Sequence, residues 1–172
     1  HTTIRGNKPA EVDGERVEGQ HPIPARARTI AEVLSKNGYA TGAMGKWGLG
    51  PPGSSGAPNA QGFDRFFGYN CQRMAHSYYP PHVWADEERI AINPDPVPGH
   101  SRQPDGEVRM EDWFDREYAP DLILADALEF LEAHAGEPFF LYLPFVEPHV
   151  AMQPPLEHVQ RYPLDWDAVS YT

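Results

Sequence analysis

The sequence predicts an α/β fold in which a mostly parallel sheet is flanked by helices. Two stretches, 29–50 and 120–149, each combine an amphipathic helical pattern with a short apolar run that follows it. A helix followed by a strand is half of a βαβ unit, and two such units indicate parallel strands covered by helices. Ligands of such sheets bind beyond the carboxyl ends of the strands, where we expect Lys46 and His149.

The first unit begins at Thr29, which forms a capping-box pair with Glu32. Gly38 stands where a left-handed residue ends a helix. Residues 39–44 are small or apolar and predict a buried strand. The predicted apolar helix face consists of Ile30, Val33 and Leu34.

The second unit begins at Pro120, because the first helical position tolerates proline, and Gly136 is expected to end its helix. Residues 139–143 form a continuous apolar run, which is typical of a strand buried on both faces. The predicted buried helix face consists of Ile123, Ala127, Phe130 and Leu131, widened by Leu124 and Leu128.

The remaining stretches are rich in proline and glycine, and we expect them to be irregular. They are residues 1–28, an insertion over 51–119 and a loop over 150–172. Within the insertion, residues 63–79 are rich in aromatic side chains, which most often form core. Residues 90–92 predict a short edge strand.

Composition excludes several classes of protein. The net charge is −11, and the acidic excess lies between Asp86 and Glu137, so no basic stripe indicates nucleic-acid binding. No apolar run approaches the roughly 18 residues of a membrane span. Cys71 is the only cysteine, which excludes a disulfide framework. The sequence starts without methionine, and we expect it to be a piece of a longer chain.

Several short motifs, in the same order, resemble the formylglycine-dependent sulfatases, and the likeness runs over about residues 29–155. This resemblance implies an alkaline-phosphatase-like α/β sandwich, with residues 1–172 forming part of one catalytic domain. It also implies hydrolysis of sulfate esters of small molecules or glycans. The motifs are Thr29–Leu34, Gly38–Gly42, Gly45-Lys46-Trp47, Gln61–Asp64, Pro138–Tyr142 and Glu147-Pro148-His149.

The resemblance also implies roles for two residues. Lys46 matches a lysine that contacts the nucleophile and the sulfate, and His149 matches a histidine that binds sulfate and protonates the leaving oxygen. The family uses Ca²⁺ and a formylglycine made by a generating or maturase enzyme. Their residues are expected outside this stretch, so no metal ligand is assigned here and the piece alone is expected to be inactive. Family members are often exported, which implies a periplasmic or extracellular location.

One departure concerns Gly48, because most relatives have histidine two residues after the lysine. A glycine there leaves space where the imidazole would lie. His76 is the only side chain of the aromatic segment whose ordinary titration falls near neutral pH. We therefore predict that His76 enters the site and replaces the absent histidine, with Tyr78 or Tyr79 lining the substrate pocket.

Two other interpretations stay open from the sequence. A phosphomonoester or phosphonate hydrolase shares the fold and could use Lys46 and His149. A non-catalytic relative that binds anionic glycans would explain Gly48.

Overall fold

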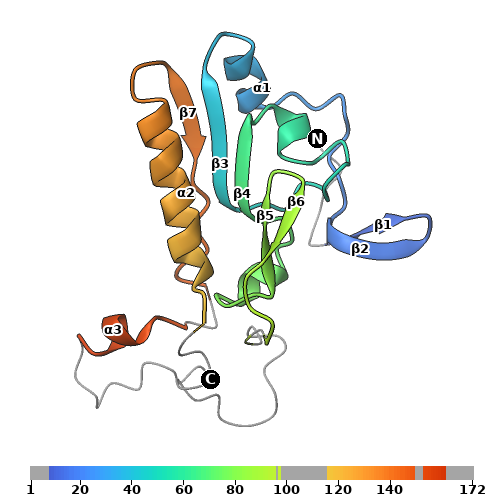
Figure 1. The fold of residues 1–172 in the computed structure, drawn as a ribbon. Helices are drawn as coiled ribbons and strands as arrows, with labels where there is room; N and C mark the ends of the chain where they lie inside the picture. Colours follow the sequence, from blue (N-terminus) through green and yellow to red (C-terminus); the bar gives the residue numbers. More distant parts are fainter. Residues whose placement is uncertain (1–7, 96, 98–115, 150–152, 162–172) are drawn as a thin grey trace.

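The computed structural model describes residues 8–95, 97, 116–149 and 153–161. Its centre is a five-stranded sheet with the strand order β6-β5-β4-β3-β7, in which β4, β3 and β7 are parallel and β5 and β6 antiparallel (Figure 1). The strands are β3 (Ala40–Lys46), β4 (Arg65–Tyr69), β5 (His82–Ala85), β6 (Glu88–Ala91) and β7 (Phe139–Tyr142).

The two predicted helix–strand units lie side by side. β3 pairs in parallel with β7, from Ala40 opposite Phe139 to Ala43 opposite Tyr142. Their carboxyl ends therefore meet at one edge of the sheet, as the sequence predicted.

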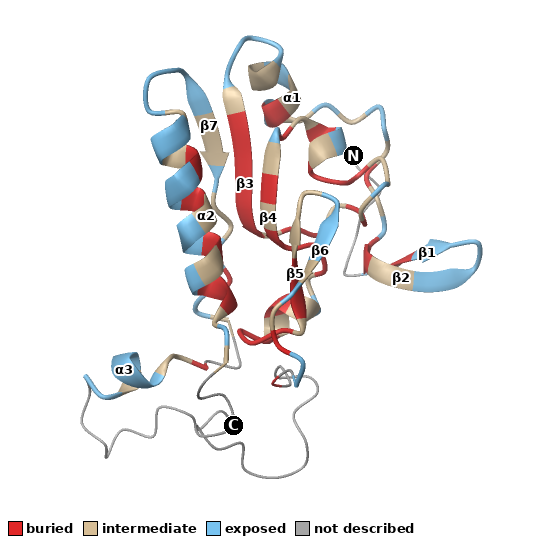
Figure 2. Cartoon of the chain, in the orientation of Figure 1, coloured by how far each residue is buried: buried red, intermediate tan, exposed pale blue. Residues whose placement is uncertain are grey.

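The helices α1 (Ile30–Ser35) and α2 (Ala119–Ala133) lie on opposite faces of the sheet. Successive side chains of a strand point to opposite faces. Ala43 belongs to a cluster with Ala31 of α1, whereas Met44 belongs to a cluster with Ile123 of α2. Strand β3 is buried along most of its length as a result (Figure 2).

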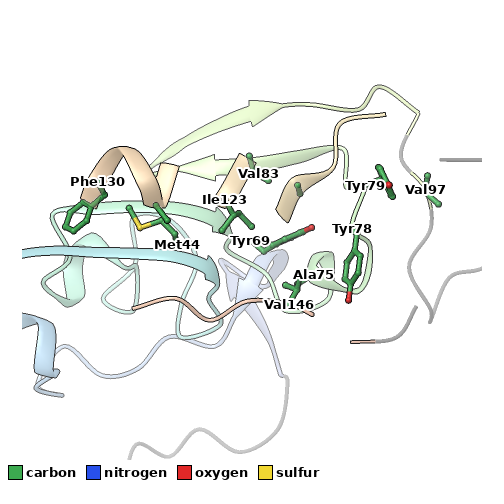
Figure 3. Close-up of a cluster of buried hydrophobic side chains, with 12 residues drawn as sticks. Met44, Tyr69, Ala75, Tyr78, Tyr79, Val83, Val97, Ile123, Phe130 and Val146 are labelled. Atoms are coloured by element: carbon green, nitrogen blue, oxygen red, sulfur yellow. The ribbon is translucent and has the colours of Figure 1, made fainter. Parts of the chain in front are cut away.

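The larger cluster lies between α2 and the sheet and extends to the carboxyl edge (Figure 3). Its members come from β3, β4, β5, α2 and the segments after β4, β6 and β7, so it fixes those segments against the strand ends. The labelled side chains of this cluster are Met44, Tyr69, Ala75, Tyr78, Tyr79, Val83, Val97, Ile123, Phe130 and Val146.

The predicted capping box of α1 is confirmed. The Thr29 hydroxyl accepts the Glu32 backbone N–H at 3.1 Å, and the Glu32 carboxylate accepts the Thr29 N–H at 3.2 Å. Gly38 has the predicted left-handed backbone, with φ +82°. The predicted apolar face is wrong, because α1 packs through the fully buried Ala31 while Ile30 is 63% exposed.

The second unit also differs in burial. Ile123, Ala127 and Phe130 are buried as predicted. Strand β7 is the edge strand of the described sheet and is not buried on both faces, since Phe139 and Tyr142 are 40% and 44% exposed. Leu124 and Leu128 of α2 are exposed rather than widening the buried face.

The expectation of a loop over residues 1–28 is wrong for residues 9–20, while residues 1–7 lie outside the described part of the chain. Strands β1 (Pro9–Val12) and β2 (Glu15–Gln20) form an antiparallel hairpin. Asp13 and Gly14 both have positive φ, the conformation that two-residue hairpin turns require and that Asp-Gly favours. Asp13-Gly14 was therefore a sequence signal for the hairpin, which was missed because the stretch was judged from its proline and glycine content.

One carboxylate of the hairpin contacts the main sheet directly. Glu18 of β2 accepts hydrogen bonds from Trp84 Nε1 at 2.9 Å and lies 2.7 Å from His82 Nε2. Burial raises the pKa of Glu18, but these hydrogen bonds and the charges of His82 and Arg89 lower it overall.

The stretch 51–119 is not irregular throughout, because its described residues include β4, β5 and β6. The predicted strand over 90–92 corresponds to the end of β6, which is an edge strand. Short helices lie at Asn59–Gln61, Met74–His76 and Leu156–Val159, the last labelled α3. None of the helices in the described ranges has the length and apolar character that spanning a membrane requires.

Candidate active site

Lys46 is the last residue of β3 and lies between its two neighbouring strands. Its backbone N–H donates to the Pro144 carbonyl at 2.8 Å, and the next N–H, of Trp47, donates to the Tyr69 carbonyl at 2.8 Å. These bonds fix the end of β3 against the segment that follows β7. Lys46 is therefore beside the segment 144–149, which carries His149.

Two glycines allow this close approach of the strands. Gly45 and Gly68 are opposite each other in the register of β3 and β4, with φ of +134° and +142°. A Cβ at Gly45 would lie 2.4 Å from the Pro144 carbonyl oxygen, and a Cβ at Gly68 would lie 2.2 Å from the Gly45 carbonyl oxygen. A larger residue at either position would push the backbone around Lys46 apart.

The Lys46 ammonium is half-buried. Burial lowers its pKa from the ordinary lysine value, because the charged form loses part of its hydration. A cation that water solvates poorly is stabilised by a bound anion, which restores the missing interactions. Lys46 is thus suited to hold an anionic group at the strand ends.

His76 and His149 lie against each other at this edge. Their ring centroids are 4.7 Å apart and the planes differ by 17°, so the two imidazoles are stacked. His76 ends the short helix Met74–His76, and His149 follows the turn after β7. His76 therefore lies beside His149, and its entry into a site shared with Lys46 stays a prediction.

The His149 backbone is fixed by hydrogen bonds on both sides. Its N–H donates to the Val146 carbonyl at 3.0 Å, and its carbonyl accepts the Tyr78 hydroxyl at 2.9 Å. Tyr78 and Val146 both belong to the large buried cluster (Figure 3). Contacts with the core thus fix the backbone from which the His149 ring projects.

Tyr78 and Tyr79 were predicted to line the substrate pocket, but their burial indicates that they are core residues. Both rings are only 2% exposed and pack in the core. Tyr78 contacts His149 through its hydroxyl, which donates to the His149 carbonyl. A direct contact of either ring with substrate stays a prediction.

The space predicted beside Gly48 is filled. A Cβ at Gly48 would lie 2.4 Å from Nε2 and 2.6 Å from Cγ of Gln72. The Gln72 backbone N–H donates to Oε1 of the buried Gln20 at 3.0 Å, so β2 anchors this residue. No local sequence signal pairs Gln72 with Gly48, because the contact depends on how the segment after β4 folds back.

The described residues contain no group of three or more His, Cys, Asp or Glu side chains placed to hold a metal ion. The calcium ion that the sequence resemblance implies therefore finds no fitting ligand set in this part of the chain. The chemistry that can be assigned here is that of a lysine cation and two imidazoles at the carboxyl edge of a parallel sheet. Such groups can bind an anion and move a proton.

The fold, and the lysine and histidines at the carboxyl edge of its sheet, can now be compared with known proteins. The sulfatase family model matches residues 3–169, and the chain belongs to the sulfatase family. Its α/β fold is that of solved sulfatase structures, as the sequence resemblance implied. A mixed, mostly parallel sheet with helices on its faces is what those structures share with it.

Three relatives illustrate the likeness. Mouse (Mus musculus) arylsulfatase G is 32% identical over 161 residues, which cover 83% of this chain and 30% of that protein. The N-acetylgalactosamine-6-O-sulfatase of Bacteroides thetaiotaomicron is 29% identical over 168 residues, covering 73% and 33%. The solved structure of Ps i-CgsB in complex with k-i-k-neocarrahexaose gives a TM-score of 0.60 at 22% identity, covering 83% and 31%. This chain spans about a third of the length of these relatives.

Proposed function

We propose that residues 1–172 form part of a catalytic domain that hydrolyses sulfate esters, with Lys46, His149 and His76 in its active site. The observation that carries the proposal is the stacking of His76 on His149 at the edge where β3 delivers Lys46. Family membership supports the reaction class.

Each group has a distinct part in the proposed reaction. Lys46 binds sulfate oxygens and offsets the negative charge that remains on them. His149 donates a proton to the ester oxygen as the bond to sulfur breaks, because charge develops on that oxygen. His76 accepts and returns a proton beside it, the part that the sequence assigned to it in place of a histidine at position 48.

The half-burial of Lys46 is consistent with this division of roles. A partly desolvated cation gains more from a bound sulfate than a hydrated one, since the local dielectric constant is lower. In this division of roles, one of the two adjacent rings acts as the proton donor and the other as the acceptor.

In sulfatases, calcium and formylglycine supply a bound cation and the nucleophile. No described residue of this chain is assigned to either, and a formylglycine-generating or maturase enzyme is the partner that this proposal requires. The steps proposed for Lys46, His149 and His76 concern only binding and proton movement.

The substrate class that we propose is a sulfated saccharide. Support comes from the names of two relatives, one an N-acetylgalactosamine-6-O-sulfatase and the other solved with a neocarrahexaose.

The test compares sulfate and phosphate monoesters of one aryl alcohol as substrates of the full-length protein, meaning the longest natural chain that contains these residues. We expect turnover of the sulfate ester, and we expect Lys46→Ala and His149→Ala each to lower kcat by about a hundredfold or more. Matched controls are Lys36→Ala at the carboxyl-terminal cap of α1 and His134→Ala at that of α2, which change the same residue types away from the site.

A preference for the phosphate ester would contradict the proposed reaction and identify a phosphomonoester hydrolase. Binding without turnover of either ester would identify a non-catalytic glycan-binding relative. Near-normal kcat in folded Lys46→Ala and His149→Ala would contradict the assigned residues.

A further inference from the structure

A hollow of about 530 Å³ opens at the carboxyl edge of the sheet, beside the amino-terminal end of α2. The residues that line it come from three places: the start of α2, the segment after β7 and the region of α3. The lining includes Tyr118, Asp121, Leu124, Phe145, Glu147 and His158. Its volume lies within the range of small-molecule sites, about 300–1,000 Å³.

The hollow is close to the candidate active site. Glu147 lines it and is two residues before His149. Tyr118 also lines it, and its ring meets that of Tyr78 at a centroid distance of 5.8 Å in a T-shaped contact. Tyr78 in turn donates its hydroxyl to the His149 carbonyl. A single tyrosine ring therefore connects the wall of the hollow to His149.

The wall combines apolar surface with hydrogen-bonding groups. Phe145 and Leu124 are 48% and 46% exposed, which leaves an aromatic and an aliphatic surface open to a ligand. The Tyr118 hydroxyl lies 3.5 Å from a Glu147 carboxylate oxygen. Burial raises the pKa of Tyr118, and the charge of Glu147 raises it further, so the phenol stays a neutral hydrogen-bond donor.

The charges of the lining disfavour a second anion. Asp121 and Glu147 carry two negative charges. Opposing them are about half a positive charge from the amino-terminal end of α2 and, when it is protonated, the imidazole of His158. Carboxylates accept hydrogen bonds from hydroxyl groups and repel sulfates and carboxylates. The surface thus suits a ligand that has an apolar face and several hydroxyls but no negative charge.

We propose that the hollow is a subsite for a neutral sugar ring of the substrate, adjacent to the ring whose sulfate reaches Lys46 and His149. This rests on the proposed function for the identity of the neighbouring group. It adds a specificity: the enzyme selects against substrates that carry a uronate or a second sulfate at the ring held in the hollow.

The experiment measures binding, so that it does not depend on turnover. The full-length protein is titrated at pH 8, where imidazoles are mostly uncharged, with a panel of neutral disaccharides (cellobiose, lactose and maltose). The protein is also titrated with the aldobiouronic acid that corresponds to each neutral disaccharide, so that each pair differs by one carboxylate. Saturation-transfer NMR reports the affinities, and inorganic sulfate serves as a separate probe of the Lys46–His149 site.

We expect at least one neutral disaccharide to bind, in the presence of sulfate, at least about tenfold more tightly than its acidic counterpart. The double variant Asp121→Asn/Glu147→Gln should reduce that preference to less than about threefold. Phe145→Ala should weaken the binding of the neutral disaccharide. The matched control is Glu129→Gln, an exposed charge change on the same helix, which should leave the preference intact.

The inference is overturned if no neutral disaccharide binds, or if its affinity is the same in the wild type and in the Phe145→Ala and double variants. It is also overturned if the preference persists after both carboxylates are neutralised. Failure of the proposed function has a different signature: the protein binds the neutral disaccharide but hydrolyses no sulfate ester.

Discussion

Replacing Gly45 with alanine tests how the sheet positions Lys46. Gly45 has φ +134°, and the added Cβ would lie 2.4 Å from the Pro144 carbonyl oxygen. The same carbonyl accepts the Lys46 N–H at 2.8 Å. The substitution therefore strains the backbone and separates β3 from the segment that leads to His149.

The expected size follows from two contributions. An L-residue in a left-handed conformation costs about 1–2 kcal/mol, and overpacking against a fixed backbone costs about 1–3 kcal/mol. Gly45→Ala should thus lower the free energy of unfolding by about 2–5 kcal/mol. Gly38→Ala is the matched control: its φ is +82°, but a Cβ there meets nothing within 4 Å, so only the first contribution applies.

The assay is urea unfolding of both variants of the full-length protein, followed by sulfate-ester turnover of the folded protein. Gly45→Ala should unfold at lower urea than Gly38→Ala and should lose kcat, because Lys46 moves away from the bound sulfate. Equal unfolding midpoints together with normal turnover in Gly45→Ala would refute the reasoning that this glycine sets the position of Lys46.

Three further predictions follow from other contacts. Burial lowers the pKa of Lys46, so its positive charge is lost at a lower pH than in an ordinary lysine. As pH rises, the midpoint at which sulfate-ester turnover falls should therefore lie below the ordinary lysine value of about 10.4. Lys46→Arg should move that midpoint to higher pH in a pH–rate profile. Because the folded-state pKa of Glu18 is lowered, its contribution to stability is present above the unfolded-state value and is lost as pH falls through the folded-state value. Glu18→Gln should therefore be less stable than wild type by about 1–3 kcal/mol at pH 7, with a difference that shrinks on acidification in urea titrations; a constant difference would contradict this. Gly48→His should impair folding or turnover because Gln72 fills the space, and adding Gln72→Ala should restore stability in thermal unfolding; no rescue would show that another contact excludes the imidazole.

The parts of the fold that depend on local signals could be predicted from the sequence. The capping box of Thr29 and Glu32, the left-handed Gly38 and the parallel pairing of the two helix–strand units all rest on short-range patterns. The Asp13-Gly14 turn was an equally local signal, but the surrounding glycines and prolines masked it.

Burial was predicted less well, because periodicity states which side chains share a face but not what covers that face. The apolar side of α1 is an example: Ile30 and Val33 share a face, yet Ala31 makes the contact with the sheet. The run over 139–143 likewise indicated a strand, although its position at the edge of the described sheet depends on the other strands.

The candidate site shows the same division. Strand-end placement predicted Lys46 and His149 from the order of elements, and His76 was singled out by its ordinary titration range. The occupation of the Gly48 space by Gln72 was not predictable, because Gln20 of a distant hairpin holds the segment that carries it.

The most direct test of the account is a double-mutant cycle between His76 and His149, measured as kcat/KM for one sulfate ester. Their stacked rings, 4.7 Å between centroids, are proposed to work as one proton-transferring unit. Residues that act as a unit have strongly non-additive effects, so we predict that the double variant His76→Ala/His149→Ala loses little more activity than His149→Ala alone. Losses that add within about 0.5 kcal/mol, or a His76→Ala variant with unchanged kcat/KM, would contradict a shared role for the two histidines.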